Sequence, residues 1–124
     1  MQDGKHVILC IDDDQDVLDF LKTVLEAAQY KVLTALTGED GVKVYQAESP
    51  DLVIVDLMME EVDAGANFIK ELRAQGCKIP VYLLSSMGDD LNQITDYSAL
   101  GLAGVLQKPL DGKKLVALLK AKLK

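Results

Sequence analysis

The stretch that decides the fold is Asp51-Leu52-Val53-Ile54-Val55-Asp56, in which four apolar residues lie between two carboxylates. The apolar run is too short for a helix, and its β-branched residues favour a strand buried on both faces of a parallel sheet. Asp56 stands where this predicted strand ends. Because the carboxyl ends of the strands form the ligand crevice of an open α/β sheet, the sequence indicates a chemical role for Asp56.

Predicted strands and helices alternate along the rest of the chain. Apolar runs and turn residues predict further strands at 7–11, 31–35, 80–84 and 104–107. Apolar residues at helical spacing predict helices at 15–29, 37–47, 67–75, 91–100 and from 111 onwards. Five strands alternating with five helices predict a single α/β domain, 1–124, with a doubly wound parallel sheet and helices on both faces. The natural candidate is the flavodoxin-like strand order 2-1-3-4-5.

The predicted helix boundaries depend on capping residues. Asp14 precedes the first helix and Thr37 opens the second, and both side chains are of the type that accepts hydrogen bonds from the first turn of a helix. The last predicted helix has leucines at helical spacing with lysines between them. We expect four of its side chains to face inward: Leu115, Leu118, Leu119 and Leu123.

Composition and charge exclude several classes of protein. The chain has 124 residues, 13 of them basic and 20 acidic, and its net charge of −7 disfavours direct binding of nucleic acid. No apolar run approaches the roughly 18 residues of a membrane-spanning helix, and residues 1–6 do not resemble a signal peptide. Cys10 and Cys77 are interpreted as small hydrophobic residues in a reducing compartment. We therefore expect a cytoplasmic domain that does not insert into membranes.

Polar side chains follow four of the predicted strands, at the point where each strand ends. They are Asp12, Asp13, Asp56, Ser85 and Lys108. Neighbouring strands lie about 4.8 Å apart, so the predicted strand order brings the first three of these residues together. Carboxylates at such close range repel one another unless a cation neutralises them, and hard oxygen ligands suit Mg²⁺, with Mn²⁺ as an alternative.

This set of residues is suited to phosphoryl transfer. With a metal bound, Asp56 can attack an incoming phosphoryl group while Lys108 and the metal neutralise the charge on the transferring oxygens. The product is an aspartyl phosphate, which adds roughly −1.5 to −2 units of charge. Ser85 can then donate a hydrogen bond to the phosphoryl group and draw its loop inward, which makes a two-state switch.

These residues resemble the motifs of response-regulator receiver domains of two-component signalling, and the similarity covers nearly the whole chain. The matching segments are 8–14 with the acid pair, 51–59 with the phosphoacceptor, 80–85 with the switch hydroxyl, and Lys108-Pro109. The resemblance implies that Asp56 is the phosphoacceptor, Asp13 a direct metal ligand and Asp12 a ligand through water. It further implies that Met58 binds the metal through its backbone carbonyl, and that Pro109 is the family's cis-proline.

The resemblance also implies how the domain works. A receiver takes its phosphoryl group from a sensor histidine kinase or a histidine phosphotransfer protein in a Mg²⁺-dependent reaction. Its output is a changed surface that controls a downstream protein or effector domain, which the sequence does not identify. Such a phosphoprotein is not an enzyme in the usual sense, because it catalyses only its own phosphorylation and dephosphorylation.

Two departures from the family pattern keep a second interpretation open. Glu60-Glu61 stands where receivers usually have Pro-Gly, and Val105 occupies the position that usually carries an aromatic rotamer switch. Both positions affect how a receiver changes its surface. The alternative is a receiver-shaped module that binds partner proteins without being phosphorylated.

An enzymatic alternative rests on the spacing of two aspartates. Asp12-x-Asp14 after the first strand resembles the nucleophile motif of haloacid-dehalogenase-like phosphatases. That family also needs a further acidic pair near the C-terminus and usually a cap, whereas only Asp111 follows Lys108 here.

Overall fold

The computed structural model describes residues 4–56, 64–76, 78–85, 103–107 and 111–123. Several predictions fall outside these ranges: the helix at 91–100, the thiol of Cys77, the Glu60-Glu61 pair, and the site residues Met58, Lys108 and Pro109.

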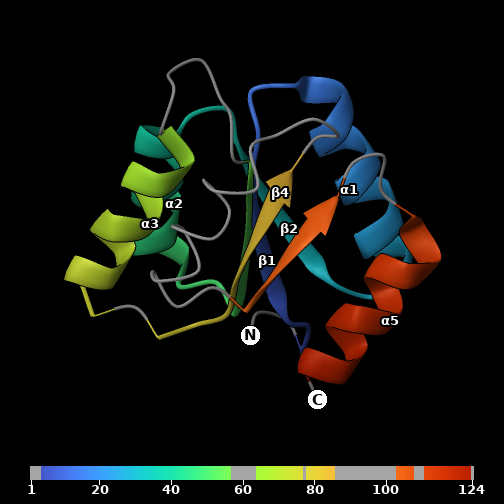
Figure 1. The fold of residues 1–124 in the computed structure, drawn as a ribbon. Coiled ribbons are helices and arrows are strands. Elements are labelled where there is room, and N and C mark those ends of the chain that lie inside the picture. Colours follow the sequence, from blue (N-terminus) through green and yellow to red (C-terminus); the bar gives the residue numbers. More distant parts are fainter. Residues whose placement is uncertain (1–3, 57–63, 77, 86–102, 108–110, 124) are drawn as a thin grey trace.

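The described strands form one parallel sheet. They are β1 (Val7–Ile11), β2 (Lys31–Ala35), β3 (Leu52–Asp56), β4 (Val81–Ser85) and β5 (Gly104–Gln107). Their order is β2-β1-β3-β4-β5, and every neighbouring pair is parallel (Figure 1). The predicted order 2-1-3-4-5 is therefore confirmed, and with it the flavodoxin-like α/β fold.

Two layers of helices enclose the sheet. The described helices are α1 (Gln15–Ala27), α2 (Gly38–Glu48), α3 (Ala64–Ala74) and α5 (Gly112–Lys122). Figure 1 shows α1 and α5 together on one side of the sheet and α2 and α3 on the other. None of the helices in the described ranges is both long and apolar enough to span a membrane.

The centre of the sheet is buried because both of its faces are covered. Every residue of β1 and β3 is buried, and their side chains alternate between two hydrophobic clusters. Leu9 and Val53 pack toward α2 and α3, whereas Ile8 and Ile54 pack toward α1 and α5. The continuous apolar runs of the sequence are thus explained by burial on two faces, as expected for central strands of a parallel sheet.

The described helix caps match the capping residues in the sequence. The Asp14 carboxylate accepts a hydrogen bond from the Asp16 N–H at 2.9 Å, and Thr37 Oγ1 accepts one from the Asp40 N–H at 3.1 Å. Asp111 caps α5 in the same way as Asp14 caps α1. These caps fix where each helix begins relative to the strand before it.

Two predictions of helix detail are wrong. Leu118 is 37% exposed, whereas Val116 packs against the core beside the buried Leu115 and Leu119. The reason is that α5 packs against α1 as well as the sheet, which turns its apolar stripe toward Val116. In addition, α3 begins at Ala64 and not at residue 67.

Candidate functional site

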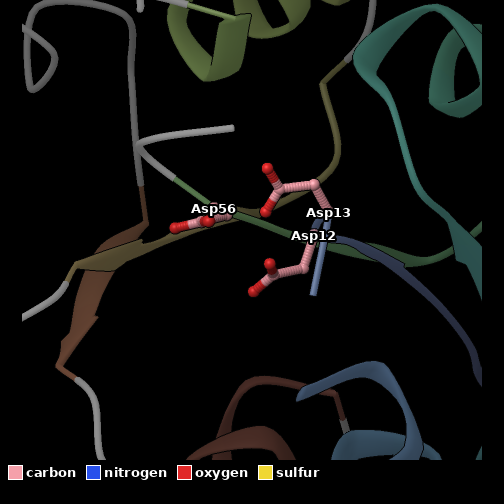
Figure 2. A group of neighbouring side chains, drawn as sticks. All are labelled: Asp12, Asp13 and Asp56. Atoms are coloured by element: carbon pink, nitrogen blue, oxygen red, sulfur yellow. The ribbon is translucent and has the colours of Figure 1, made fainter. Parts of the chain in front are cut away.

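Three carboxylates from neighbouring strands converge at the carboxyl edge of the sheet. Asp12 and Asp13 directly follow β1, and Asp56 is the last residue of the adjacent β3. One carboxylate oxygen from each residue lies within 4.8 Å of the others, and Figure 2 shows the three side chains gathered at this point. The predicted cluster is therefore confirmed; below, we call these three residues the acidic triad.

Burial differs within the acidic triad. Asp12 has no exposed surface and Asp56 is 5% exposed, whereas Asp13 is exposed. Burying ionised carboxylates is unfavourable unless a positive group or hydrogen bonds compensate them. The triad thus combines two carboxylates held inside the protein with one that faces solvent, where an ion can enter.

The backbone around β1 orients Asp12. Its N–H donates to the Ala35 carbonyl at the end of β2, with the two atoms 3.2 Å apart. Its Oδ1 accepts a hydrogen bond from the Asp14 N–H at 2.9 Å. Main chain and side chain of Asp12 are therefore both anchored, the first by β2 and the second by the turn into α1.

The chemistry of the acidic triad fits a hard divalent cation. Mg²⁺ is bound in proteins by one or two carboxylates, further oxygen ligands and several waters. Asp12, Asp13 and Asp56 supply carboxylate oxygens close enough to share one ion, and the exposure of Asp13 leaves room for waters. Nothing in this donor set favours a soft metal, because none of the three ligands is nitrogen or sulfur.

Cys10 lies on β1 two residues before Asp12, but it does not belong to the site. It is fully buried, and its thiol is free. Burial, and to a smaller extent the negative charge of Asp12, raises the pKa of the Cys10 thiol from 9.0 to about 12. The thiol is therefore protonated at neutral pH and serves as a core side chain.

The remaining predicted site residues are only partly covered by the described ranges. Ser85 is the last residue of β4, the neighbour of β3, so its backbone lies at the same edge of the sheet as Asp56. Val105 lies in β5 opposite Leu83 of β4 and is 42% exposed. Lys108, Met58 and Pro109 lie outside the described residues, so their roles stay predictions.

One contact of the site does not follow from the predicted roles of its residues. The sequence predicts Asp14 as the cap of the first helix, and in the structure its backbone N–H also donates a hydrogen bond to the Asp12 carboxylate. The signal that could have revealed this is the spacing of the two aspartates, since an Asp side chain commonly accepts a hydrogen bond from the backbone two residues on.

Comparison with known proteins identifies the family. Residues 8–120 match the family model described as "Response regulator receiver domain", and the chain belongs to that family. It is 35% identical over 124 residues to "Probable transcriptional regulator ycf27" of Cyanophora paradoxa, and the matched region covers all of this chain and 51% of that protein. It is 31% identical over 117 residues to "Alkaline phosphatase synthesis transcriptional regulatory protein PhoP" of Bacillus subtilis (strain 168), covering 94% of this chain and 48% of that protein. The chain thus spans about half the length of these curated relatives.

Solved structures show the same fold. Chemotaxis protein CheY4 of Vibrio cholerae superposes with a TM-score of 0.87 at 26% identity, covering 97% of this chain and 100% of that one. A response regulator receiver domain protein from Clostridium thermocellum gives a TM-score of 0.85 at 27% identity, covering 95% of this chain and 94% of that one.

Family membership and the acidic triad together define the class of function. The chain is a receiver domain of two-component signalling with an acidic pocket suited to phosphoaspartate chemistry, and it is not a conventional enzyme. The phosphatase interpretation of Asp12-x-Asp14 is therefore wrong. The triad is typical of the Mg²⁺ site of receivers, and membership in this family implies a histidine kinase as partner.

Proposed function

We propose that this receiver accepts a phosphoryl group on Asp56 from a sensor histidine kinase or a histidine phosphotransfer protein and then controls another protein or domain through its changed surface. The observation that carries this proposal is the acidic triad, whose three carboxylates lie within 4.8 Å of one another with Asp56 buried. Asp56 is the member fixed in a central strand, which gives the nucleophile a defined orientation.

In this proposal four groups hold Mg²⁺, or Mn²⁺ in its place: the carboxylates of Asp13 and Asp56, Asp12 through a water molecule, and the backbone carbonyl of Met58. A bound divalent cation neutralises negative charge on the transferring phosphoryl oxygens. The anchoring of Asp12 by Ala35 and Asp14 supports its role as a preorganised member of this set.

The transfer step moves one phosphoryl group between two side chains. A carboxylate oxygen of Asp56 forms a bond to phosphorus while the bond from phosphorus to the imidazole nitrogen of the donor histidine breaks. The nitrogen keeps the electron pair of that bond, and Asp56 becomes a mixed anhydride of carboxylic and phosphoric acid. Lys108 neutralises a phosphoryl oxygen in this proposal, and Pro109, the next residue in the sequence, has a structural role.

We assign the switch to β4 and β5, which lie on the side of β3 away from β1. Ser85 ends β4 at the edge where the phosphoryl group forms, and its hydroxyl is proposed to donate a hydrogen bond to that group. Val105, which is 42% exposed on β5, then contributes an aliphatic patch to the output surface, in place of an aromatic side chain that changes rotamer.

The setting of the domain is also a proposal. We take residues 1–124 as one receiver domain in the cytoplasm; the family match over residues 8–120 supports the extent, and the free thiol of Cys10 agrees with a reducing compartment. The relatives named as transcriptional regulators suggest an output to transcription. With a net charge of −7, this domain would pass that signal through another domain or protein and would not bind DNA itself.

The test is phosphorylation by a small-molecule donor. The protein is incubated with acetyl phosphate, with and without Mg²⁺, and its intact mass is measured. We expect a single phosphoryl adduct that requires the metal and is released by hydroxylamine, as an acyl phosphate is. Absence of any adduct, together with no Mg²⁺-dependent response to beryllofluoride, would contradict the proposal and favour the interaction module that works without phosphorylation.

A further inference from the structure

We propose that Asp14 is a positioning residue for the metal site, which it serves by holding the Asp12 carboxylate through the cap of α1. This inference rests on the proposed Mg²⁺ site and adds a residue that is not itself a ligand. Asp14 is exposed and does not belong to the acidic triad.

Two consecutive hydrogen bonds connect the helix cap to the acidic triad. The Asp14 N–H donates to Asp12 Oδ1, and the Asp16 N–H donates to Asp14 Oδ1, each at 2.9 Å. Asp14 is thus a donor toward the site through its backbone and an acceptor toward the helix through its side chain. The position of the Asp14 N–H depends on the hydrogen bond of the Asp14 carboxylate, because both groups belong to one residue.

The conformation of Asp14 is set by the helix it caps. Its backbone is extended, with φ −95° and ψ 108°, as expected for an N-cap residue. Its carbonyl accepts hydrogen bonds from the N–H groups of Val17 and Leu18, both at 3.2 Å. Removing the carboxylate leaves the Asp16 N–H without its acceptor, so the first turn of α1 becomes free to fray. The Asp14 N–H then loses its fixed direction.

The Asp12 carboxylate is sensitive to the direction of the Asp14 N–H because Asp12 is fully buried. Its backbone is held by the Ala35 carbonyl at 3.2 Å, and the Asp14 N–H holds Oδ1 of its carboxylate at 2.9 Å, so displacement of that N–H would change how the carboxylate is turned. Groups that hydrogen-bond to a metal-binding side chain orient it and thereby raise metal affinity. The cap of α1 accordingly tunes the affinity of the site without touching the ion.

The experiment compares Mn²⁺ binding by the wild type, Asp14→Ala and Asp14→Asn, with free Mn²⁺ measured by electron paramagnetic resonance. Mg²⁺ is then added as a competitor. We expect Asp14→Ala to weaken Mn²⁺ binding about tenfold, the low end of the effect of such orienting groups. Asn caps helices about as well as Asp. Asp14→Asn should therefore retain the affinity to within about threefold, despite the loss of a charge.

Asp111 provides a matched control on another helix. Its Oδ1 accepts hydrogen bonds from the Lys113 N–H at 3.0 Å and the Lys114 N–H at 3.3 Å, so it caps α5 as Asp14 caps α1. Asp111→Ala should lower the urea midpoint of unfolding by an amount similar to Asp14→Ala and leave the Mn²⁺ affinity unchanged. Amide hydrogen exchange at residue 14 should accelerate only in Asp14→Ala.

The possible results separate this inference from the proposed function. Wild-type affinity in Asp14→Ala, or equal weakening in Asp111→Ala, would overturn the positioning role. If Asp14→Asn binds as weakly as Asp14→Ala, charge and not the cap is responsible, and the inference is likewise wrong. Failure of the wild type to bind Mn²⁺ would instead contradict the metal site itself, and with it both proposals.

Discussion

An aspartate stands at each end of β3, Asp51 directly before the strand and Asp56 as its last residue, and the two play different roles. At the amino end, Asp51 Oδ2 accepts a hydrogen bond from the Val7 N–H, and the Asp51 N–H donates to the Val7 carbonyl, both at 2.8 Å. At the carboxyl end, Asp56 lies with Asp12 and Asp13 in the acidic triad, within 4.8 Å. One aspartate therefore pairs two strands, whereas the other contributes to a charged site.

The difference comes from what each edge of the sheet offers to a carboxylate. At the amino edge, backbone N–H groups lie close to hydrogen-bond acceptors on the neighbouring segment; the Lys31 N–H, for example, donates to the His6 carbonyl at 2.9 Å. At the carboxyl edge, two neighbouring strands each deliver carboxylates to the same place. Close like charges are unfavourable until a cation joins them. The hydrogen bonds at the amino edge thus stabilise the fold. The repulsion between carboxylates at the carboxyl edge lowers stability, and the same carboxylates are suited to bind a cation.

The largest effect is expected from exchanging each carboxylate for its amide. Asp56→Asn should reduce Mg²⁺-dependent phosphorylation by acetyl phosphate below detection, because a neutral amide is not a nucleophile toward phosphorus. Asp51→Asn should be phosphorylated normally, since an amide oxygen can still accept from the Val7 N–H. Intact mass distinguishes the two, and circular dichroism checks the fold. Phosphorylation of Asp56→Asn at the wild-type level, or loss of phosphorylation in Asp51→Asn, would contradict the different roles of the two aspartates.

Mg²⁺ should raise the free energy of unfolding by binding the acidic triad at the carboxyl edge, with no contribution from Asp51 at the amino edge. A ligand that binds only the folded state adds about 2.7 kcal/mol to the free energy of unfolding at one hundred times its Kd. We expect this gain in the wild type and in Asp51→Asn, measured by urea denaturation, and a much smaller gain in Asp13→Asn at the same Mg²⁺ concentration. Asp13→Asn should also be more stable than the wild type in EDTA, because charge repulsion is relieved. An undiminished response to Mg²⁺ in that variant would exclude Asp13 from the site.

Removing the carboxylate at the amino edge should cost stability and leave chemistry intact. Asp51→Ala deprives the Val7 N–H of its acceptor, which costs about 1–3 kcal/mol when the group is partly buried. The urea midpoint should fall accordingly, while phosphorylation of the folded protein stays at the wild-type level. A variant as stable as the wild type would show that the hydrogen bond from the Val7 N–H to the Asp51 carboxylate does not stabilise this end of the sheet.

The smallest effect concerns Cys10, which lies between the two edges and opposite Ile54 in the register of β1 and β3. Its folded pKa of about 12 exceeds the ordinary value of 9.0, mainly because of burial. The unfolded thiol therefore ionises first, and the stability contributed by the neutral buried thiol is lost as pH rises from 9 toward 12. Up to about 1.4 kcal/mol per pH unit is expected in this window.

The measurement is urea denaturation of the wild type and Cys10→Ala between pH 8 and pH 10.5. The difference in free energy of unfolding should be constant below pH 9 and should shrink above it, since only the wild type has this titrating group. A constant difference across the whole range would show that the Cys10 thiol ionises in the folded protein as readily as in the unfolded chain.

Much of the fold follows from the sequence because the central strands are continuous apolar runs. Residues 7–11 and 52–55 can be buried on both faces only if helices cover both sides, and this fixes a parallel sheet. The strand order then places Asp12 and Asp13 beside Asp56 before any coordinates are known. The acidic triad was predictable because its members are side chains attached to strand ends.

The details that could not be predicted depend on packing between elements. Leu118 fits the helical spacing of α5, but contact with α1 turns Val116 inward in its place. The first turn of α3 contains Ala64 and Ala66, which favour helix without adding a large apolar side chain to the pattern. The contact from Asp14 to Asp12 uses a backbone N–H, which every residue other than proline possesses.

Phosphorylation of Asp56 is tested most directly by locating the phosphoryl group in the sequence. The protein is phosphorylated with acetyl phosphate and Mg²⁺, and borohydride then reduces the acyl phosphate so that the modified aspartate becomes homoserine. Fragment masses of the peptides that contain residues 51–56 and residues 12–13 assign the position. We expect homoserine at residue 56 and unmodified aspartate at residue 51. Homoserine at residue 51, or at residue 12 or 13 with Asp56 unchanged, would contradict this expectation.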